Sequence, residues 1–400
     1  MTVLERILAF HDGRDPERLA LKYQILAESP FAFFRGTAHL FYEDFAKESN
    51  QLPGSPKVWV CGDAHMENFG VYKGDNRLVY FDFNDFDEAA LAPALWELIR
   101  MLTSIALSIP NPEQSRLLAE AFLAEYAIEL ATGKSRWVER ATARDGVRDL
   151  VYSLKGRSRK QLLKRRTLRD GASRAVRTDG DFALPLLPGE WESLRDFLKV
   201  FADHAGRAEF FHLLSAGRRI AGNGSLGVNR YILLVEGKGS PDKNYLLDLK
   251  QARPSVIAAY IPQPEWLSEA HRIVAIQHRM QAISPAFLHP ASMANEAYLL
   301  RELVPREDRI RLATFLAHPA VLQQILTTEA SVMAWSQLRS SGRQGSSSAD
   351  ELIAFGTDTT WHKLLIDLAH KYARRITREQ KEFRKATANG LKIPNKSQPS

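Results

Sequence analysis

The chain has 400 residues, of which 45% are hydrophobic and 25% are charged, and its net charge is +7. This length predicts a bilobal fold or two domains, and the composition is that of a globular protein with a core. No run approaches the roughly 18 apolar residues that span a bilayer. The single cysteine, Cys61, excludes an internal disulfide, so we expect a cytoplasmic protein without membrane contact.

The first third of the chain predicts helices on both sides of a short β segment. Apolar periodicity indicates helical structure over residues 16–48 and again over residues 92–132. Two short strands are expected between them, at residues 57–62 and 77–83, joined by a loop that contains glycines and Asp75.

The second half predicts β structure followed by helices. Residues 217–250 indicate a glycine-rich turn and two strands that are separated by a polar turn. A helix is expected at 265–282, a strand at 296–303, and mostly helical structure from there to about residue 388. The tail at 391–400 is expected to be disordered.

The most basic stretch, at residues 154–174, favours a solvated helix face. No aromatic residues interleave with its basic residues, as a stacking platform for nucleic acid would require, so a nucleic-acid partner is not expected. The sequence ATGKSR at 131–136 is not a phosphate-binding P-loop, because Ile128 stands where that loop needs its first glycine. The net charge is compatible with an anionic ligand such as a nucleotide.

Acidic and amide side chains gather in the segment GDAHMENFGVYKGDNRLVYFDFNDFDE. Asp63 follows the first strand, Asn68 lies five residues later, and Asp82 ends the second strand. Phosphoryl transfer needs a carboxylate that orients the acceptor hydroxyl, together with oxygen ligands that hold magnesium. We therefore predict that Asp63 is catalytic and that Asn68, Asp82 and Asp85 bind the metal. A hairpin with acidic turns explains the packed acids poorly, because like charges repel.

The other acids of this segment are expected to have structural roles. Asp87 and Glu88 precede a helix predicted to begin near Leu91, whose dipole favours acids in its first turn. Glu67 and Asp75 are expected to be solvated.

A second set of residues, GNGSLG at 222–227, lies about 160 residues further along the chain. Small residues let backbone amides approach a phosphate closely. Lys250 closes the second of the following strands, from which it would reach the α and β phosphates of a nucleotide. The glycines alone could form an ordinary hairpin turn. The presence of Lys250 at the end of the second following strand favours a nucleotide-binding site instead. The predicted cofactor-binding residues are Gly222, Asn223, Gly224, Ser225, Gly227 and Lys250.

The segments GDAHMENF and YFDFND resemble the catalytic and metal-binding segments of kinase-like phosphotransferases, especially the aminoglycoside and choline kinase branch. The resemblance implies the catalytic aspartate for Asp63, an amide metal ligand for Asn68, and the aspartate of the Asp-Phe-Gly segment for Asp82. In that fold the glycine-rich loop and its lysine precede the catalytic loop, whereas here they follow it. We therefore expect an α+β, bilobal, circularly permuted kinase-like fold with a small antiparallel β lobe and a large helical lobe.

The whole chain is similar to the bacterial family called domain of unknown function 2252, from SPFAFFRGTAHLFYEDF through to YLLREL. Arg35 and Arg301 resemble the recurring arginines of this family, and both substrate or phosphate contact and ordinary ion pairing stay open for them. His65 is a further candidate contact. The expected division is a large-lobe part at 1–210, the small β lobe at 211–305, and a helical large-lobe part at 306–390.

The kinase resemblance has three departures. Cys61 replaces the histidine that stands two residues before the catalytic aspartate, and Asn84 replaces the glycine of Asp-Phe-Gly. The helix glutamate that should pair with Lys250 is not evident, with Glu269 and Gln277 as candidates.

The function we expect is ATP- and magnesium-dependent phosphoryl transfer to a small-molecule acceptor. The alternatives are a nucleotide-binding pseudokinase or nucleotidyltransferase-like regulator and, below these, a metallophosphoesterase. GDAH and GNGS superficially resemble blocks of that last class, but its upstream Asp-x-His and clustered histidines are missing from the sequence.

Overall fold

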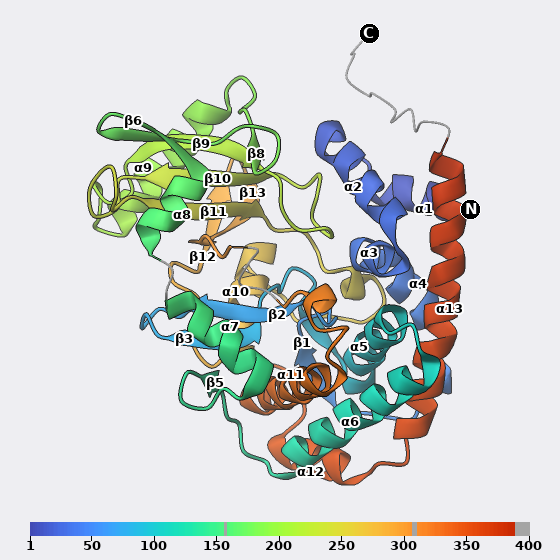
Figure 1. Ribbon diagram of the computed structural model, residues 1–400. Coiled ribbons are helices and arrows are strands. Elements are labelled where there is room, and N and C mark those ends of the chain that lie inside the picture. The colour runs from blue at the N-terminus through green and yellow to red at the C-terminus, as the bar shows by residue number, and fades with distance from the viewer. Residues whose placement is uncertain (156–157, 306–309, 389–400) are drawn as a thin grey trace.

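The computed structural model describes residues 1–155, 158–305 and 310–388 (Figure 1). Helices and antiparallel sheets make up this part of the chain, which confirms the α+β class expected from the sequence. The predicted disorder of residues 391–400 concerns residues outside the described ranges. Among the described residues, no helix combines the length and the apolar character needed to cross a membrane.

A six-stranded antiparallel sheet lies at the upper left of Figure 1, with strand order β12-β13-β11-β10-β9-β8. Its strands are β8 (Ala183–Leu184), β9 (Leu213–Arg219), β10 (Arg230–Val235), β11 (Tyr245–Gln251), β12 (His289–Met293) and β13 (Glu296–Glu302). The helix α9 (Glu190–His204) packs on one face through Leu194 and Leu198, which share a core cluster with Leu233 and Leu247.

The opposite face of this sheet carries charged side chains. Successive side chains of a strand point to opposite faces. Leu247 and Leu249 belong to the core cluster under α9, so Asp248 and Lys250 point the other way, toward the rest of the molecule. The same alternation places Arg230 opposite Lys250 in the β10–β11 pair. This face positions one half of the candidate site.

Helices at both ends of the sequence build the other part of the molecule around the largest core cluster. The N-terminal helices are α1 (Val3–Phe10), α2 (Pro16–Glu28), α3 (Pro30–Gly36) and α4 (Ala38–Glu48). The helix α13 (His362–Thr387), red in Figure 1, lies beside them. The remaining helices here are α5 (Ala94–Ser108), α6 (Pro112–Ala131), α11 (Pro319–Ser340) and α12 (Ala349–Thr357).

Three short sheets and three further helices complete the described chain. One sheet pairs β1 (Lys57–Val60) with β4 (Ala90–Pro93), and another contains β2 (Phe69–Lys73), β3 (Val79–Phe83) and β5 (Val138–Glu139). The third pairs β6 (Thr167–Asp170) with β7 (Ser173–Val176). The helices are α7 (Asp145–Lys155), α8 (Arg159–Arg166) and α10 (Glu269–Met280).

Local capping explains why the long helical region expected at 16–48 is divided. Asp15 caps α2 and Ser29 caps α3, each followed by a proline at the first helical position. The backbone of Ser29 is extended, which ends α2 and starts α3 in a new direction.

Two sequence expectations about the acidic segment are wrong. The helix expected near Leu91 begins only at Ala94, because residues 90–93 pair with β1 as strand β4. The loop expected between the first two strands contains β2, which pairs with β3 in a hairpin. The β2–β3 pairing determines where β3 ends and therefore which acids leave the sheet.

Candidate functional site

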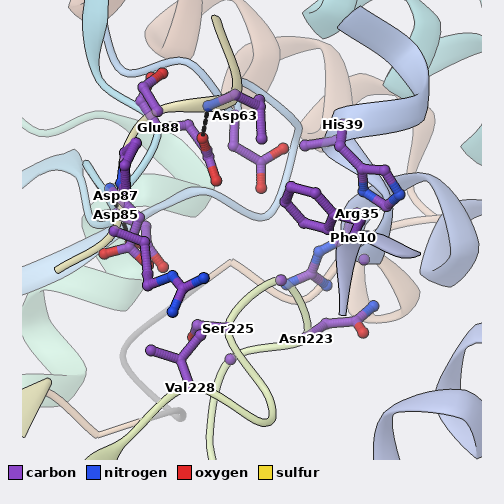
Figure 2. Close-up of a pocket in the computed structure, with 18 of the residues that line it drawn as sticks. Phe10, Arg35, His39, Asp63, Asp85, Asp87, Glu88, Asn223, Ser225 and Val228 are labelled. Atoms are coloured by element: carbon purple, nitrogen blue, oxygen red, sulfur yellow. Dashed lines mark hydrogen bonds between the residues drawn. The ribbon is translucent and has the colours of Figure 1, made fainter. Parts of the chain in front are cut away.

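A cavity of about 440 Å³ lies between the charged face of the six-stranded sheet, the N-terminal helices and the loops that follow β1 and β3. In Figure 2, Asp63, Asp85, Asp87 and Glu88 occupy one side, with Arg35 and His39 opposite them. Segments far apart in the sequence therefore meet at one site. The predicted site residues that line it are Arg35, Asp63, His65, Asn68, Asp85, Gly222, Asn223, Gly224, Ser225 and Lys250.

Lys250 is the cationic group that the sheet contributes to this cavity. Its side chain is 3% exposed, and its ammonium group forms an ion pair with Asp87 and lies 3.8 Å from Asp85 Oδ1. Burial and the neighbouring Asp85 raise the pKa of Asp87, while Lys250 opposes this effect. The lysine is thus held at the cavity by the acidic loop that follows β3.

The helix α10 supports this acidic loop without pairing with Lys250. Glu269 accepts a hydrogen bond from Arg272 Nε at 2.5 Å, and Gln277 donates to Gln281, so neither candidate contacts the lysine. Arg272 is buried and donates to the carbonyl oxygens of Asp87 and Ala89. The contribution of α10 is therefore to orient the loop that supplies the partner of Lys250.

Asp63 is oriented by a buried arginine of α5. Arg100 Nε donates to Asp63 Oδ1 at 2.9 Å, and the arginine side chain is fully buried. Among the described residues, no hydrogen bond to Asp63 Oδ2 is found. This arrangement fixes the carboxylate and leaves its second oxygen for a ligand in the cavity.

Asn68 ties the two acidic loops together. Its Nδ2 donates to the carbonyl oxygens of Asp63, at 3.1 Å, and Asp85, at 3.2 Å. Its Oδ1 accepts the backbone N–H of Asp85 at 3.0 Å. Both ends of the amide are thus engaged by the backbone, and the contacts that the structure shows for Asn68 position Asp63 relative to Asp85.

Asp82 lies outside the cavity. Its carboxylate accepts the backbone N–H groups of Phe83, at 2.8 Å, and Ala282, at 3.4 Å. Asp82 is still within β3, whereas the cavity is reached only after the strand ends at Phe83, so Asp85 and Asp87 face it instead. An Asp-Phe pair three residues later than the predicted one therefore contributes to the site.

The buried position of Asp82 leads to a pH prediction. Burial raises its pKa from about 3.8 to about 6. The native state then binds more protons than the unfolded state between these pH values, so the free energy of unfolding should fall as pH rises from 3.8 to 6. The fall should be about 3 kcal/mol, at about 1.4 kcal/mol per pKa unit.

In denaturant titrations across that pH range, the Asp82→Asn variant should lose the part of the fall that Asp82 contributes, about 3 kcal/mol. Other buried acids, such as Glu88, still titrate in this variant. The control is Asp75→Asn, which removes an exposed carboxylate from the same hairpin and should keep the wild-type profile. Unchanged pH dependence in Asp82→Asn would show that Asp82 is ionised in the native state.

Two other predicted residues also lie outside the cavity. Gly227 has φ +91°, and a Cβ atom there would lie 2.8 Å from Leu19 of α2, so this glycine allows close packing. Arg301 donates to the carbonyl oxygen of Asn84 at 3.2 Å and lies 3.6 Å from the carboxylate of Asp248.

Asp248 is the centre of a buried charge cluster on the same sheet face. It accepts two hydrogen bonds from Arg230, at 2.8 and 2.6 Å, and forms an ion pair with Arg219 at 2.6 Å. Burial alone would raise the pKa of Asp248, but the charges of Arg219 and Arg230 bring it well below its usual range. One carboxylate thus neutralises part of the charge of several buried arginines.

Asp87 and Glu88 line the cavity, so the prediction that they cap a helix is wrong. Glu88 accepts the backbone N–H of Val256 at 2.7 Å, and burial raises its pKa to about 7. Gly62 has φ +80°, and a Cβ atom there would lie 1.9 Å from the carbonyl oxygen of Glu88. Glycine at position 62 thus lets the two acidic loops touch.

The prediction that Glu67 is solvated is also wrong. Its carboxylate pairs with Arg35 and accepts the backbone N–H of Leu312 at 3.1 Å. Arg35 forms this ion pair and also lines the cavity, and its contact with a substrate or phosphate stays a prediction.

The glycine-rich turn is held from outside by the N-terminal helices. Lys22 donates to the carbonyl oxygen of Gly224 at 2.6 Å, and Asn223 donates to the carbonyl oxygen of Ala32 at 2.6 Å. Because a trans peptide places C=O and N–H on opposite sides, the N–H of Ser225 points away from Lys22. Burial, with Arg14 nearby, lowers the pKa of Lys22 well below its usual value.

The family model for an uncharacterized protein conserved in bacteria, domain of unknown function 2252, matches residues 14–386. The chain belongs to this family. The match confirms the family resemblance seen in the sequence motifs. Searches of curated proteins and of solved structures return no match.

In this member of the family, the oxygen atoms suited to magnesium come from the loop after β3. Among the described residues, no group of three or more His, Cys, Asp and Glu side chains is arranged to hold a metal by itself. Magnesium commonly takes one or two carboxylates and completes its shell with substrate phosphates and water. Asp85 and Asp87 are the carboxylates that could supply such oxygens beside Lys250.

Proposed function

We propose that this protein is an ATP- and magnesium-dependent phosphotransferase of the kinase-like type that acts on a small-molecule acceptor. The observation that carries the proposal is the shared cavity of the glycine-rich turn, Lys250, Asp63 and the Asp85–Asp87 loop. Phosphoryl transfer depends mainly on positioning and charge stabilisation, and these groups supply both.

The order of elements in the six-stranded sheet supports this proposal. A glycine-rich turn joins β9 to β10, Lys250 follows on β11, and α10 comes next. In protein kinases the glycine-rich loop, the lysine of the third strand and the following helix have the same order. We therefore keep the kinase-like, bilobal and circularly permuted fold as part of the proposal. The boundary expected at residue 210 is wrong, because β8 and α9 already belong to the six-stranded sheet and its core cluster.

The residues have separate roles in the proposed reaction. Asp63 is fixed by Arg100 and accepts the proton of the acceptor's hydroxyl group. The hydroxyl oxygen forms a bond to the γ-phosphorus, and the bond between the γ-phosphorus and the bridging oxygen of the β-phosphate breaks. Lys250 and the backbone of residues 222–225 hold the phosphates. Magnesium ATP, when bound, supplies the phosphoryl group and neutralises its charge, with Asp85 and Asp87 as metal-facing carboxylates.

A second candidate is a nucleotide-binding regulator without transfer activity. Lys250 is already paired with Asp87, and Asp63 is already paired with Arg100. These ion pairs engage the lysine and the aspartate that catalysis would need, which favours a protein that binds nucleotide without transferring phosphate. Measurement of nucleotide consumption therefore separates the two candidates.

Titration calorimetry with magnesium and a non-hydrolysable ATP analogue tests the proposal. We expect wild-type protein to bind the analogue and Lys250→Met to bind it at least about 10-fold more weakly, or ~1.4 kcal/mol. Lys243→Met removes an exposed lysine between β10 and β11 and should bind as wild type does. Absence of binding by the wild type, or equal binding by Lys250→Met, would contradict the proposed nucleotide site. ATP consumption with a panel of acceptors then distinguishes the enzyme from the regulator.

A further inference from the structure

The cavity contains several buried polar atoms that lack hydrogen-bond partners in the described part of the chain. Three of these residues come from the N-terminal helices and the loop after α1. The atoms are Arg14 Nε, Arg35 Nε and both ring nitrogens of His39. Buried polar groups in proteins nearly always have partners. Their convergence on one cavity indicates a ligand that supplies the missing hydrogen bonds. We call Phe10, Arg14, Arg35 and His39 the N-terminal wall.

The glycine-rich turn adds two more such atoms to the same cavity. Asn223 Oδ1 and Ser225 Oγ are buried and lack partners in the described chain, and Ser225 is only 9% exposed. A ligand at this side of the cavity can therefore donate a hydrogen bond to Asn223 Oδ1 or Ser225 Oγ, and it can accept one from the Ser225 hydroxyl.

Phe10, His39 and Arg14 form a stack within the wall. The rings of Phe10 and His39 are parallel, with centroids 3.9 Å apart, and the Arg14 guanidinium lies 4.7 Å from the Phe10 centroid. Burial, with Lys22 and Arg14 nearby, lowers the pKa of His39 to about 2. The imidazole is therefore neutral at physiological pH and offers one donor and one acceptor, which suits a hydroxyl group.

The two arginines of the wall differ in their pairing. Arg35 pairs with Glu67, whereas no ion pair of Arg14 is found in the described chain, and Arg253 lines the same cavity. Burial and the charge of Arg253 lower the pKa of Arg14 to about 10. Asp12, an acid of the same N-terminal segment, also lines the cavity and has contacts of its own. An anion bound here would relieve the repulsion between the guanidinium groups of Arg14 and Arg253.

Three of the carboxylates that line the cavity lie across it from Arg35 and His39. They are those of Asp85, Asp87 and Glu88 (Figure 2). Asp87 is also neutralised by Lys250. The cavity therefore has an acidic side that is suited to a metal and phosphates, and another side that presents Arg14 and the Glu67-paired Arg35.

We propose that the N-terminal wall binds an anionic, hydroxylated small molecule of the sugar-acid or sugar-phosphate type. Its acid group contacts Arg14 and Arg35, its hydroxyl groups contact His39 and the glycine-rich turn, and its carbon skeleton packs on Phe10. The assignment as acceptor rests on the proposed phosphotransferase function. It also separates this chain from the aminoglycoside and choline kinases that its motifs resemble, because aminoglycosides and choline are cations.

Direct binding without nucleotide tests the wall. The probes are gluconate and glucose 6-phosphate, with neutral glucose and cationic kanamycin for comparison, each measured by titration calorimetry. We expect at least one acid to bind, and glucose and kanamycin to bind at least about 10-fold more weakly, or ~1.4 kcal/mol. Failure of both acids to bind up to millimolar concentration, or tighter binding of kanamycin, would overturn the proposal.

Variants locate the binding. Arg14→Gln and Arg35→Gln should each weaken binding of the acid by about 10-fold or more, ~1.4 kcal/mol. Arg14→Lys should bind the acid more tightly than Arg14→Gln, because it keeps the charge. Arg374→Gln removes an exposed arginine from α13 and should have no effect. Equal binding by the folded wall variants and the wild type would place the acid elsewhere.

A final pair of measurements separates this inference from the proposed function. The acid should bind equally well when the magnesium complex of a non-hydrolysable ATP analogue is present, and its displacement by the analogue would contradict a separate acceptor site. Binding of the acid without phosphate transfer from ATP would contradict the phosphotransferase function and leave the wall in place. Transfer to glucose or kanamycin alone would contradict the wall and support the function.

Discussion

The Asp63→Asn variant should transfer phosphate about 10²–10⁴-fold more slowly than the wild type and still bind nucleotide, because an amide cannot accept the acceptor proton. The amide oxygen can still accept the hydrogen bond that Arg100 Nε donates to Asp63 Oδ1. Turnover should therefore fall even in protein that circular dichroism shows to be folded. Single-turnover kinetics and calorimetry with an ATP analogue measure the two effects separately.

The choice of asparagine in this experiment follows from the burial of Arg100. Both alanine and asparagine remove the carboxylate that pairs with the fully buried guanidinium, which costs stability. Asparagine keeps an acceptor for the Arg100 Nε–H and therefore costs less than alanine. The control is Asp203→Asn, which removes an exposed carboxylate near the end of α9 and should transfer at the wild-type rate. Wild-type turnover in Asp63→Asn would exclude Asp63 as the proton acceptor.

The Asp248→Asn variant should lose about 3–5 kcal/mol of unfolding free energy, since this is the cost of breaking a buried ion pair. Asp248 is 1% exposed and accepts charge-assisted hydrogen bonds from Arg230 while it pairs with Arg219. An amide removes the negative charge and leaves these guanidinium groups buried on the sheet face. Urea denaturation followed by circular dichroism measures the loss.

The matched control for Asp248 is Asp242→Asn. Asp242 also pairs with two cations, Arg174 and Lys160, but at the protein surface, where water and salt screen the charges. Its removal should have a much smaller effect on the unfolding midpoint. If both variants unfold at the same urea concentration, the buried cluster does not hold the sheet together.

Sequence patterns identified much of the sheet half of the site. The apolar alternation of YLLDLK predicts a strand, and in the structure it directs Asp248 and Lys250 to the face opposite α9. The glycine-rich turn lies between two strands, as its composition predicts. Strands and turns are determined largely by residues that are close together in the sequence, so they can be predicted from the sequence alone.

The sequence did not reveal which acids leave the β2–β3 hairpin toward the cavity. The end of β3 is set by its pairing with β2, where Phe83 lies opposite Phe69. The sequence predicts a loop at residue 69, a metal ligand at Asp82 and a helix cap at Asp87. The acids that face the cavity thus begin three residues after the predicted one, at Asp85, while Asp82 is buried in the strand.

Apart from Arg35, the residues of the N-terminal wall were not predictable, because no periodic pattern along the chain marks them. Phe10, Arg14 and His39 belong to α1, the loop that follows it and α4, and no motif connects them. Only the packing of these elements brings the three side chains onto one cavity. A polar residue between apolar neighbours, such as His39 in AHLFY, was the sequence feature that could have indicated a cavity-lining residue.

The contacts of α2 with the glycine-rich turn also affect the order of events during synthesis. Lys22 leaves the ribosome first, but Gly224, which accepts its hydrogen bond, is 202 residues away in the sequence. At about 5–20 residues per second, α2 waits about 10–40 s for this partner. Leu19, which packs against Gly227 in the finished protein, has no such cover in the meantime. Completion of this cavity must therefore wait for residue 259, the last residue that lines it, so ligand binding reports that the chain has folded at least that far.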